Sequence, residues 1–364
     1  METENKMEIS RRDLIASVTA GIALSTASTA STKAVPNLYP GPASIGHRFI
    51  DANGLKVHIA EQGSGPLVLL CHGFPESWYS WRHQIPALAD TGYRAVAPDM
   101  RGYGGTDAPP ERDSYTIMDL VGDMVGVVSA LGEKRAVIVG HDWGATVAWH
   151  AALLRPDIFP AVVAMSVPYR QRGPSPPLRL LRQAGLNTYY WIYYQDAGVA
   201  DAEYDRDPKA TLRRTLYTFS GDAPHSEINR RILEPGKGAL DNTLEPEHLP
   251  PWLTESDLDY MASELKKAGF RNPLNYYRNI DRNWQLLAPW AGAVIHQPAL
   301  FIAGKEDHVI RGPTGEKQLK DLPTTVPGLK GTVLLDGVGH YVQQERPQAV
   351  TTALLDFLKT QNLT

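Results

Sequence analysis

The sequence predicts an α/β fold built on a mostly parallel, doubly wound sheet. Short apolar runs rich in β-branched residues alternate along the chain with segments of helical pattern. One of these runs, residues 66–71, is continuously apolar, as is typical of a strand that a parallel sheet buries on both faces. Since such sheets bind ligands at the carboxyl ends of their strands, we expect one functional site at that edge.

The globular part begins near His47 with a predicted hairpin. Asn53-Gly54 separates two β-type runs, residues 47–51 and 55–61, and an Asn-Gly pair there favours a tight turn. The remaining elements follow in order: strands at 66–71, 93–98, 135–139 and 161–166, helices at about 117–131 and 145–154, then, after a long interruption, strands at 297–304 and 331–335 and a helix at about 347–359.

The interruption, residues 169–296, loses the strand pattern and gains Tyr, Trp, Pro and Arg. We interpret it as a helical lid over a core formed by residues 47–168 and 297–364. One lid helix has clear boundaries. Thr254-Glu-Ser-Asp is an N-terminal capping pattern, and Gly269 marks the C-terminal end.

Composition argues against several classes of protein. The 364 residues carry a formal net charge of −4 and no long basic run, which disfavours nucleic-acid binding. The single cysteine, Cys71, excludes an intrachain disulfide and a cysteine-based metal site. Because Cys71 ends an apolar run, we expect a buried, inert thiol. The oligomeric state stays open.

The first 33 residues predict a cleaved twin-arginine export signal. Arg11-Arg12 precedes a mildly apolar stretch, residues 16–24, and small residues follow, with the better cleavage position after Ala30. The apolar stretch is too short for a stable membrane span. We expect export to the periplasm. The alternative is a cytoplasmic protein with a disordered N-terminal tail.

The clearest functional signal is Gly140-His-Asp142-Trp-Gly144, between a predicted strand and a predicted helix. Small residues two positions before and after the central residue are typical of a nucleophile elbow, where a Cβ would crowd the neighbouring elements. An aspartate at the centre can attack carbon directly and leave an ester, which favours an alkyl carbon over an acyl group. The alternative is an Asp142 that merely caps the following helix.

An aspartyl ester needs a base and a water for its hydrolysis. His340 is the candidate base, in a Gly-rich loop after the last predicted strand, and Asp307 follows the preceding strand. Asp307 would fix the tautomer of the histidine and stabilise its cationic form. Glu306 is the reserve acid, and the adjacent His308 is less suited to either role.

Charge that develops on the ester oxygen needs N–H donors. The backbone N–H groups of Trp143 and Phe74 are the candidates for this oxyanion hole. The alternative for the His-Gly-Phe-Pro motif that starts at His72 is a tight turn. His72, Asp99 and Ser166 also fall at or just past predicted strand ends, so we expect them at the same site.

These motifs resemble those of the α/β-hydrolase family and, within it, the epoxide hydrolases. His-Gly-Phe-Pro-Glu-Ser-Trp from His72, Asp-Met-Arg-Gly-Tyr-Gly from Asp99 and the motif from Gly140 are also shared with the haloalkane dehalogenases. The resemblance covers nearly all of residues 47–360, including the lid. The three motifs are specific for the group of enzymes and not for the reaction.

Motifs in the lid distinguish epoxide hydrolases from haloalkane dehalogenases. Epoxide hydrolases of this type carry two lid tyrosines that hold the epoxide oxygen, in segments similar to residues 190–198 and 271–279 of this chain. By position in those segments the resemblance assigns Tyr190 and Tyr277, with Tyr193 and Tyr276 in reserve. It implies that an epoxide and water give a vicinal diol through an ester on the nucleophilic aspartate, with no metal and no organic cofactor.

Two rival functions remain. A haloalkane or haloacetate dehalogenase would use the same Asp-His-Asp set, but it would need halide-binding donors such as a second Trp or an Asn. A ligand-binding protein on a hydrolase scaffold would have no need of Asp142 or His340, and both are present.

Overall fold

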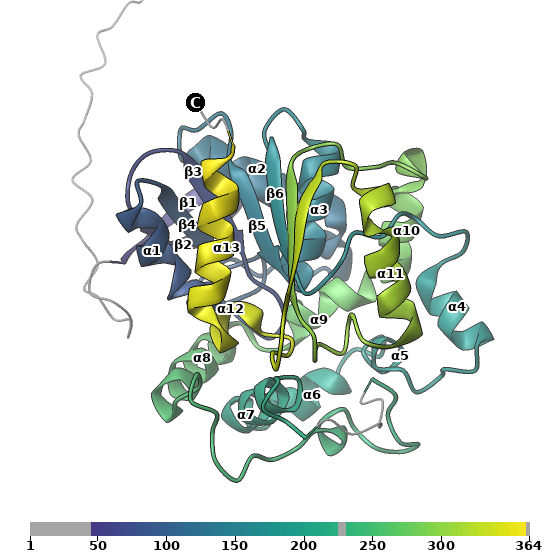
Figure 1. The fold of residues 1–364 in the computed structure, drawn as a ribbon. Helices are drawn as coiled ribbons and strands as arrows, with labels where there is room; N and C mark the ends of the chain where they lie inside the picture. Colours follow the sequence, from purple (N-terminus) through teal and green to yellow (C-terminus); the bar gives the residue numbers. More distant parts are fainter. Residues whose placement is uncertain (1–44, 225–230, 362–364) are drawn as a thin grey trace, which may run out of the picture. The chain divides into compact units, whose positions relative to one another are not determined.

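The computed structural model describes residues 45–224 and 231–361, all within one compact unit, Asn37–Thr364. Eight strands form one sheet in the order β1-β2-β4-β3-β5-β6-β7-β8 (Figure 1). The strands are β1 (Gly46–Ala52), β2 (Leu55–Gln62), β3 (Leu67–Cys71), β4 (Arg94–Pro98), β5 (Val137–His141), β6 (Ala161–Met165), β7 (Ala299–Gly304) and β8 (Leu329–Leu335). Only the pairs β1·β2 and β2·β4 are antiparallel, which confirms the predicted fold class.

The predicted hairpin is present at the start of the sheet. Ala52 pairs with Leu55, and the two residues between them, Asn53 and Gly54, both have positive φ angles of 51° and 76°. A two-residue turn of this kind requires the left-handed region at both positions, which Asn and Gly tolerate best.

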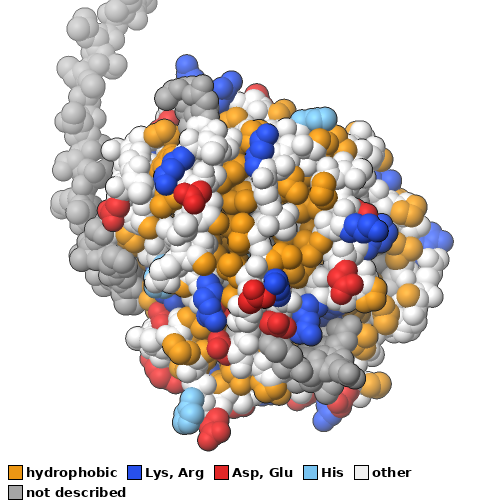
Figure 2. Space-filling model, viewed as in Figure 1, with side chains coloured by type: hydrophobic (Ala, Val, Ile, Leu, Met, Phe, Trp, Pro, Cys, Tyr) orange, Lys and Arg blue, Asp and Glu red, His pale blue; other side chains and the backbone are white. Residues whose placement is uncertain are grey.

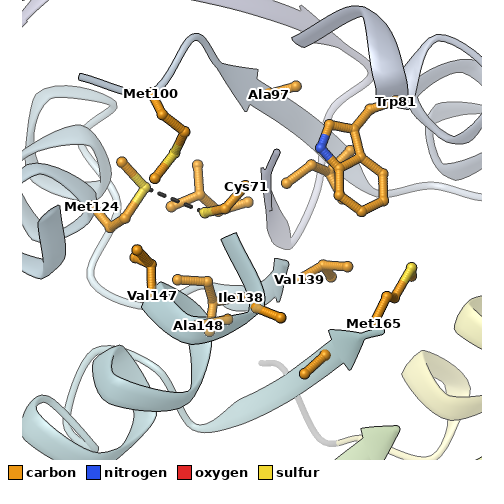
Figure 3. Close-up of a cluster of buried hydrophobic side chains, with 14 of the residues drawn as sticks. Cys71, Trp81, Ala97, Met100, Met124, Ile138, Val139, Val147, Ala148 and Met165 are labelled. Carbon is orange, nitrogen blue, oxygen red and sulfur yellow. Dashed lines mark hydrogen bonds between the residues drawn. The ribbon is translucent and has the colours of Figure 1, made fainter. Parts of the chain in front are cut away.

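Helices cover both faces of the sheet: α1 (Gln84–Asp90) and α13 (Pro347–Lys359) lie on one face, and α2 (Ile117–Ala130) and α3 (Trp143–Leu154) on the other (Figure 1). Strands β3, β5 and β6 are buried at every position, which explains their continuous apolar character. Cys71 at the end of β3 lies inside this core, with its Sγ 3.3 Å from the sulfur of Met124 (Figure 3). Burial raises the pKa of the Cys71 thiol, so it is the buried thiol that the sequence predicts.

Between β6 and β7 the chain leaves the sheet, and we refer to its described residues here as the β6–β7 segment. It contains α4 (Pro177–Gln183), α5 (Tyr190–Tyr193), α6 (Ala200–Asp205), α7 (Pro208–Thr218), α8 (Glu255–Ala268), α9 (Arg271–Arg278) and α10 (Ile280–Leu286). Helix α8 has the predicted ends, because Thr254 and Asp257 form a capping box and Gly269 follows the last turn at φ 68°. Helices α6, α7 and α8 lie beyond the ends of the strands, at the bottom of the view in Figure 1. The division into core and lid stays a prediction.

After β7 come α11 (Gly312–Thr325), β8, the short α12 (Val342–Glu345) and α13, whose predicted bounds are confirmed. No helix among residues 45–224 and 231–361 is long and apolar enough to cross a membrane. The predicted export signal lies outside the described residues.

Candidate active site

Asp142 occupies the turn between β5 and α3 in a strained backbone conformation, with φ 51° and ψ −116°. Its side chain makes no capping hydrogen bond to α3, so the capping alternative does not account for it. Instead, Oδ1 of Asp142 accepts a hydrogen bond of 2.9 Å from the backbone N–H of Phe74. The carboxylate is therefore held away from the helix and toward the loop after β3.

Three glycines make this geometry sterically accessible. A Cβ on Gly140 would lie 2.0 Å from the carbonyl oxygen of Gly144, and a Cβ on Gly144 would lie 2.0 Å from that of Cys71. A Cβ on Gly73 would lie 2.4 Å from the Cβ of Asp142. Backbone atoms cannot give way cheaply at such distances, which is why the elbow needs glycine on both sides of the nucleophile.

His340 bridges Asp142 and Asp307. Its Nε2 lies 3.5 Å from Oδ2 of Asp142, and its Nδ1 lies 3.1 Å from both carboxylate oxygens of Asp307. Asp307 is fully buried and follows β7, and its Oδ1 also accepts the N–H of Val309 at 2.8 Å. The structure thus brings together the three side chains that the sequence assigned to nucleophile, base and acid.

The charges of the three groups support one another. Burial alone would raise the pKa of Asp142 and Asp307, but contact with His340 outweighs it, lowering the pKa of Asp142 and bringing that of Asp307 to about 2. Burial would lower the pKa of His340, yet Asp307 and Asp142 together hold it well above its usual value. Before any reaction, the site is therefore an imidazolium between two carboxylates.

A second buried layer supports His340, and of its members the sequence placed only Ser166 at the site. The backbone carbonyl oxygen of His340 accepts a hydrogen bond of 2.7 Å from Oγ of Ser166 and lies 2.8 Å from Nε2 of His141. His141 in turn has its Nδ1 2.7 Å from Glu76, a fully buried carboxylate. The sequence provided no separate reason to assign Glu76 a role, because Glu76 lies inside the motif that starts at His72, and a tight turn was an alternative explanation for that motif.

The other residues that the sequence placed at strand ends, and the reserve acid, do not line the cavity beside Asp142. Ser166 contacts the site through His340, as described above. Asp99 bonds to Nδ1 of His58 at 2.8 Å, and His72 accepts the N–H of Met100 at 2.9 Å, so both organise neighbouring loops and do not line the cavity. The reserve acid Glu306 pairs with Arg311 at 3.0 Å on the surface, away from His340.

A partly open cavity of about 70 Å³ lies against Asp142 and His340. Its walls combine core loops with the β6–β7 segment: Phe74, Asp142, Tyr190, Tyr194, Tyr204, Thr215, Phe219, Arg231, Leu233, Ala239, Thr243, Tyr277, His308, Val309, His340 and Tyr341. A second hollow lies on the outer surface between β8 and α13, where hydrophobic side chains gather in the middle of the face in Figure 2. None of the predicted site residues lines that outer hollow.

The cavity distinguishes the assigned tyrosines from their reserves. Tyr190 and Tyr277 line it, with ring centroids 5.9 Å apart. The hydroxyl of Tyr193 donates to Glu203 at 2.8 Å, and that of Tyr276 donates to the carbonyl oxygen of Arg101 at 2.9 Å. The hydroxyls of Tyr193 and Tyr276 therefore stabilise the fold and are not available to a substrate.

Tyr190 and Tyr277 both stay protonated at neutral pH. Burial raises the pKa of Tyr190 and of Tyr277 well above 10, and the nearby negative charge of Asp142 adds to this effect. Two neutral phenols therefore line the same cavity as an ionised carboxylate. This arrangement suits an electrophile that is attacked at one atom and needs O–H donors at another.

Trp143 is the first residue of α3, so its backbone N–H belongs to the helix end that has no partner inside the helix. Its ring packs edge-on against Tyr277 at 5.1 Å. The use of the Trp143 and Phe74 N–H groups as an oxyanion hole stays a prediction.

Other cavity residues were not predicted as site residues. Tyr194 and Tyr204 join their hydroxyls at 2.6 Å, and Thr215, Arg231 and Thr243 add polar groups. Their positions depend on the path of the β6–β7 segment, which sequence periodicity does not provide.

The family model described as alpha/beta hydrolase fold matches residues 66–347. Epoxide hydrolase A of Mycobacterium tuberculosis is 44% identical over 314 residues, which cover 85% of this chain and 96% of that protein. Epoxide hydrolase 3 of Siraitia grosvenorii is 42% identical over 86% of this chain and 98% of its own length.

Solved structures agree with these relatives. A structure titled epoxide hydrolase from an endophytic Streptomyces superposes with a TM-score of 0.83 at 44% identity, over 87% of this chain and 96% of that one. Epoxide hydrolase A from Mycobacterium thermoresistibile superposes with a TM-score of 0.82 at 44% identity, over 88% of this chain and 100% of that one. The chain belongs to the α/β-hydrolase family. Within that family it is one of the epoxide hydrolases, as its motifs predicted.

Proposed function

We propose that this chain converts an epoxide and water to a vicinal diol in two steps, with Asp142 as nucleophile and His340 as base. Tyr190 and Tyr277 hold the epoxide oxygen, and Asp307 orients the imidazole of His340. The observation that carries the proposal is a single cavity in which an ionised aspartate on a strained turn meets a histidine and two protonated phenols.

In the first step the carboxylate of Asp142 attacks one epoxide carbon, and the C–O bond breaks toward the two phenols. The leaving alkoxide is more basic than a phenolate, so a phenolic O–H can hydrogen-bond to it or donate its proton as the bond breaks. Closely packed aromatic rings at the cavity, such as those of Phe74 and Tyr277 at 5.5 Å, favour an apolar or aryl substituent on the epoxide.

In the second step water cleaves the ester. Esterification removes the negative charge of Asp142, which is one of the two charges that raise the pKa of His340 in the free enzyme. The imidazole then loses its proton more readily and can act as a base toward water. Asp307 stays ionised throughout and stabilises the imidazolium that forms. The N–H groups of Phe74 and Trp143 serve the oxyanion of this step.

The same triad would serve a dehalogenase, but the cavity offers little to a halide. Among the described residues that line it, none is Trp or Asn. The donors that the proposal uses are two phenols, which help a basic alkoxide to leave and help a weakly basic halide little. The epoxide reaction therefore uses the two phenols, whereas halide release would have no use for them.

Product analysis on the parent enzyme tests this proposal. We expect diol formation from members of a panel of aliphatic, aryl and terpene epoxides, and negligible halide release from haloalkanes of matched carbon skeleton. Efficient halide release with no diol would overturn the proposal in favour of the dehalogenase.

We also propose that the protein is exported to the periplasm through a twin-arginine signal. The support is the layout of residues 1–33, an arginine pair followed by a mildly apolar stretch and small residues. We expect a mature N-terminus between about residues 27 and 33. Mass measurement of the native protein checks this, and a chain with Met1 or Glu2 still at its N-terminus would favour the cytoplasmic alternative.

A further inference from the structure

Next to the catalytic acid, His308 adds a third side chain of the type that binds metal ions. Asp307, His308 and His340 each offer one ligand atom, and these atoms lie within 4.8 Å of one another. Oxygens of Asp307 lie 3.1 Å from Nδ1 of His340 and 3.4 Å from Nδ1 of His308. Ligand atoms of a tetrahedral zinc ion stand roughly 3.3–3.5 Å apart, given bonds of about 2.0–2.2 Å. The two distances from Asp307 are therefore close to those of a small transition-metal site.

His308 itself provides an independent reason to look for a ligand here. Its Nδ1 is buried and makes no hydrogen bond among the described residues, because the Asp307 oxygen 3.4 Å away does not meet hydrogen-bond geometry. A buried nitrogen without a partner costs free energy, which a ligand can recover. The ring is held in place between Phe219, at a centroid distance of 4.4 Å, and His340, at 5.0 Å. His308 also lines the cavity, which provides a route for an ion.

We propose that Asp307, His308 and His340 form an inhibitory binding site for one divalent transition-metal ion of the zinc class. When the ion binds, the Nδ1 proton of His340 leaves to solvent and the metal takes its place. The hydrogen bond between His340 and Asp307 is then lost, and the imidazole can no longer accept a proton as the catalytic base does. A water molecule would complete the coordination, as in zinc sites with three protein ligands.

The chemistry of the three ligands selects among cations. Two imidazoles and one carboxylate suit zinc, cobalt, nickel and copper, whereas calcium and magnesium prefer all-oxygen sites. The carboxylates of Asp307 and Asp142 attract the ion. Arg231 lines the same cavity and opposes it with its positive charge. In the free enzyme the imidazolium of His340 opposes the ion as well. That charge leaves with the Nδ1 proton that the metal replaces, and two carboxylates then face the single positive charge of Arg231.

Direct binding of Co²⁺ tests the site without any epoxide. Tetrahedral Co²⁺ has a characteristic visible absorption, so titration of the full-length protein should reveal one equivalent that Zn²⁺ displaces. His308→Phe keeps an aromatic ring beside Phe219 and removes one ligand, so we expect an affinity loss of about 100-fold or more. The matched control is His248→Gln, since His248 is a well-exposed histidine on the β6–β7 segment, with 89% of its side chain accessible. The control should bind Co²⁺ as the parent does.

Inhibition provides the second readout. Zn²⁺ should inhibit diol formation by the parent and by His248→Gln, EDTA should reverse it, and Mg²⁺ should have no effect. The rate of His308→Phe, relative to its own metal-free rate, should be insensitive to the same Zn²⁺ concentration. His308→Leu serves if the phenylalanine variant does not fold by circular dichroism. Absence of a tetrahedral Co²⁺ spectrum in the parent, or equal affinity in parent and His308 variants, would overturn the proposal. Because the spectrum needs no turnover, this failure is distinguishable from a failure of the epoxide mechanism.

Discussion

The two sides of the cavity are held in place by different means. On the core side, Asp142 and His340 are positioned by backbone: glycines in contact with neighbouring carbonyl groups fix the elbow, and hydrogen bonds to its main-chain oxygen fix His340. On the side of the β6–β7 segment, Tyr190 lies on the four-residue helix α5, which buries none of its residues fully.

Side-chain pairs provide the support that α5 lacks. The buried ion pair of Arg278 and Asp201 joins α9 to α6, and the hydroxyl of Tyr193 on α5 bonds to Glu203 on α6. The difference shows that the core side tolerates almost no added atom, whereas hydroxyls of the segment can be removed one at a time. Substitution of the elbow glycines should therefore affect mainly stability, whereas removal of a hydroxyl from the cavity tyrosines Tyr190 and Tyr277 should affect mainly the rate.

The largest expected effect is on the segment side and concerns rate. Tyr190→Phe and Tyr277→Phe should each slow epoxide opening, by about 10²–10³ if each acts as a single oxyanion donor does, and the double variant by on the order of 10⁴ or more. The melting temperature should change little, because each substitution deletes only one hydroxyl from a residue that lines the cavity. Single-turnover kinetics measures the rates.

A matched pair sharpens this prediction. Tyr193→Phe and Tyr276→Phe make the same chemical change on the same two helices, at hydroxyls that bond to Glu203 and to the backbone of Arg101. Their double variant should keep the parent rate to within several-fold and lose on the order of 1–2 kcal/mol of stability. A double Tyr190 and Tyr277 variant that opened epoxides at the parent rate would argue against the proposed role of the phenols.

A smaller effect, on the core side, concerns stability. Gly144→Ala places a Cβ 2.0 Å from the carbonyl oxygen of Cys71, and neither backbone can move without disturbing the sheet. We expect a loss of about 3 kcal/mol or more in the free energy of unfolding, by denaturant titration. Gly173→Ala is the control, since a Cβ there meets nothing within 4 Å, and it should change stability by less than about 0.5 kcal/mol. Equal stability of the two variants would show that the elbow relaxes more easily than its contacts indicate.

Much of the core side was predictable because its signals are local. The Asn53-Gly54 turn and the glycines around Asp142 each depend on backbone rules that hold within a few residues, as do the ends of α8 in the β6–β7 segment. The order of nucleophile, acid and histidine at successive strand ends then placed the triad, since parallel strands bring their carboxyl ends together.

The segment side was predictable only in part. Adjacent tyrosines fit the same helix, and only tertiary contacts decide that Tyr277 lines the cavity while Tyr276 bonds to a core loop. The cavity position of Arg231 likewise follows from packing. Helix α11 was not predicted, because Gly315 and Pro323 interrupt its pattern. His308 was set aside as a neighbour of the acid, and its burial against Phe219 is a tertiary fact.

The two-step mechanism is tested most directly by trapping the ester. Reaction of His340→Ala with an epoxide substrate, followed by mass spectrometry of the peptide that contains Asp142, measures the intermediate itself. We predict that an adduct of substrate mass accumulates on that peptide, because attack by Asp142 needs no base while hydrolysis needs His340. Asp142→Ala should form no adduct and no diol. Turnover of His340→Ala at a near-normal rate without any adduct would contradict the assignment of His340 as the base.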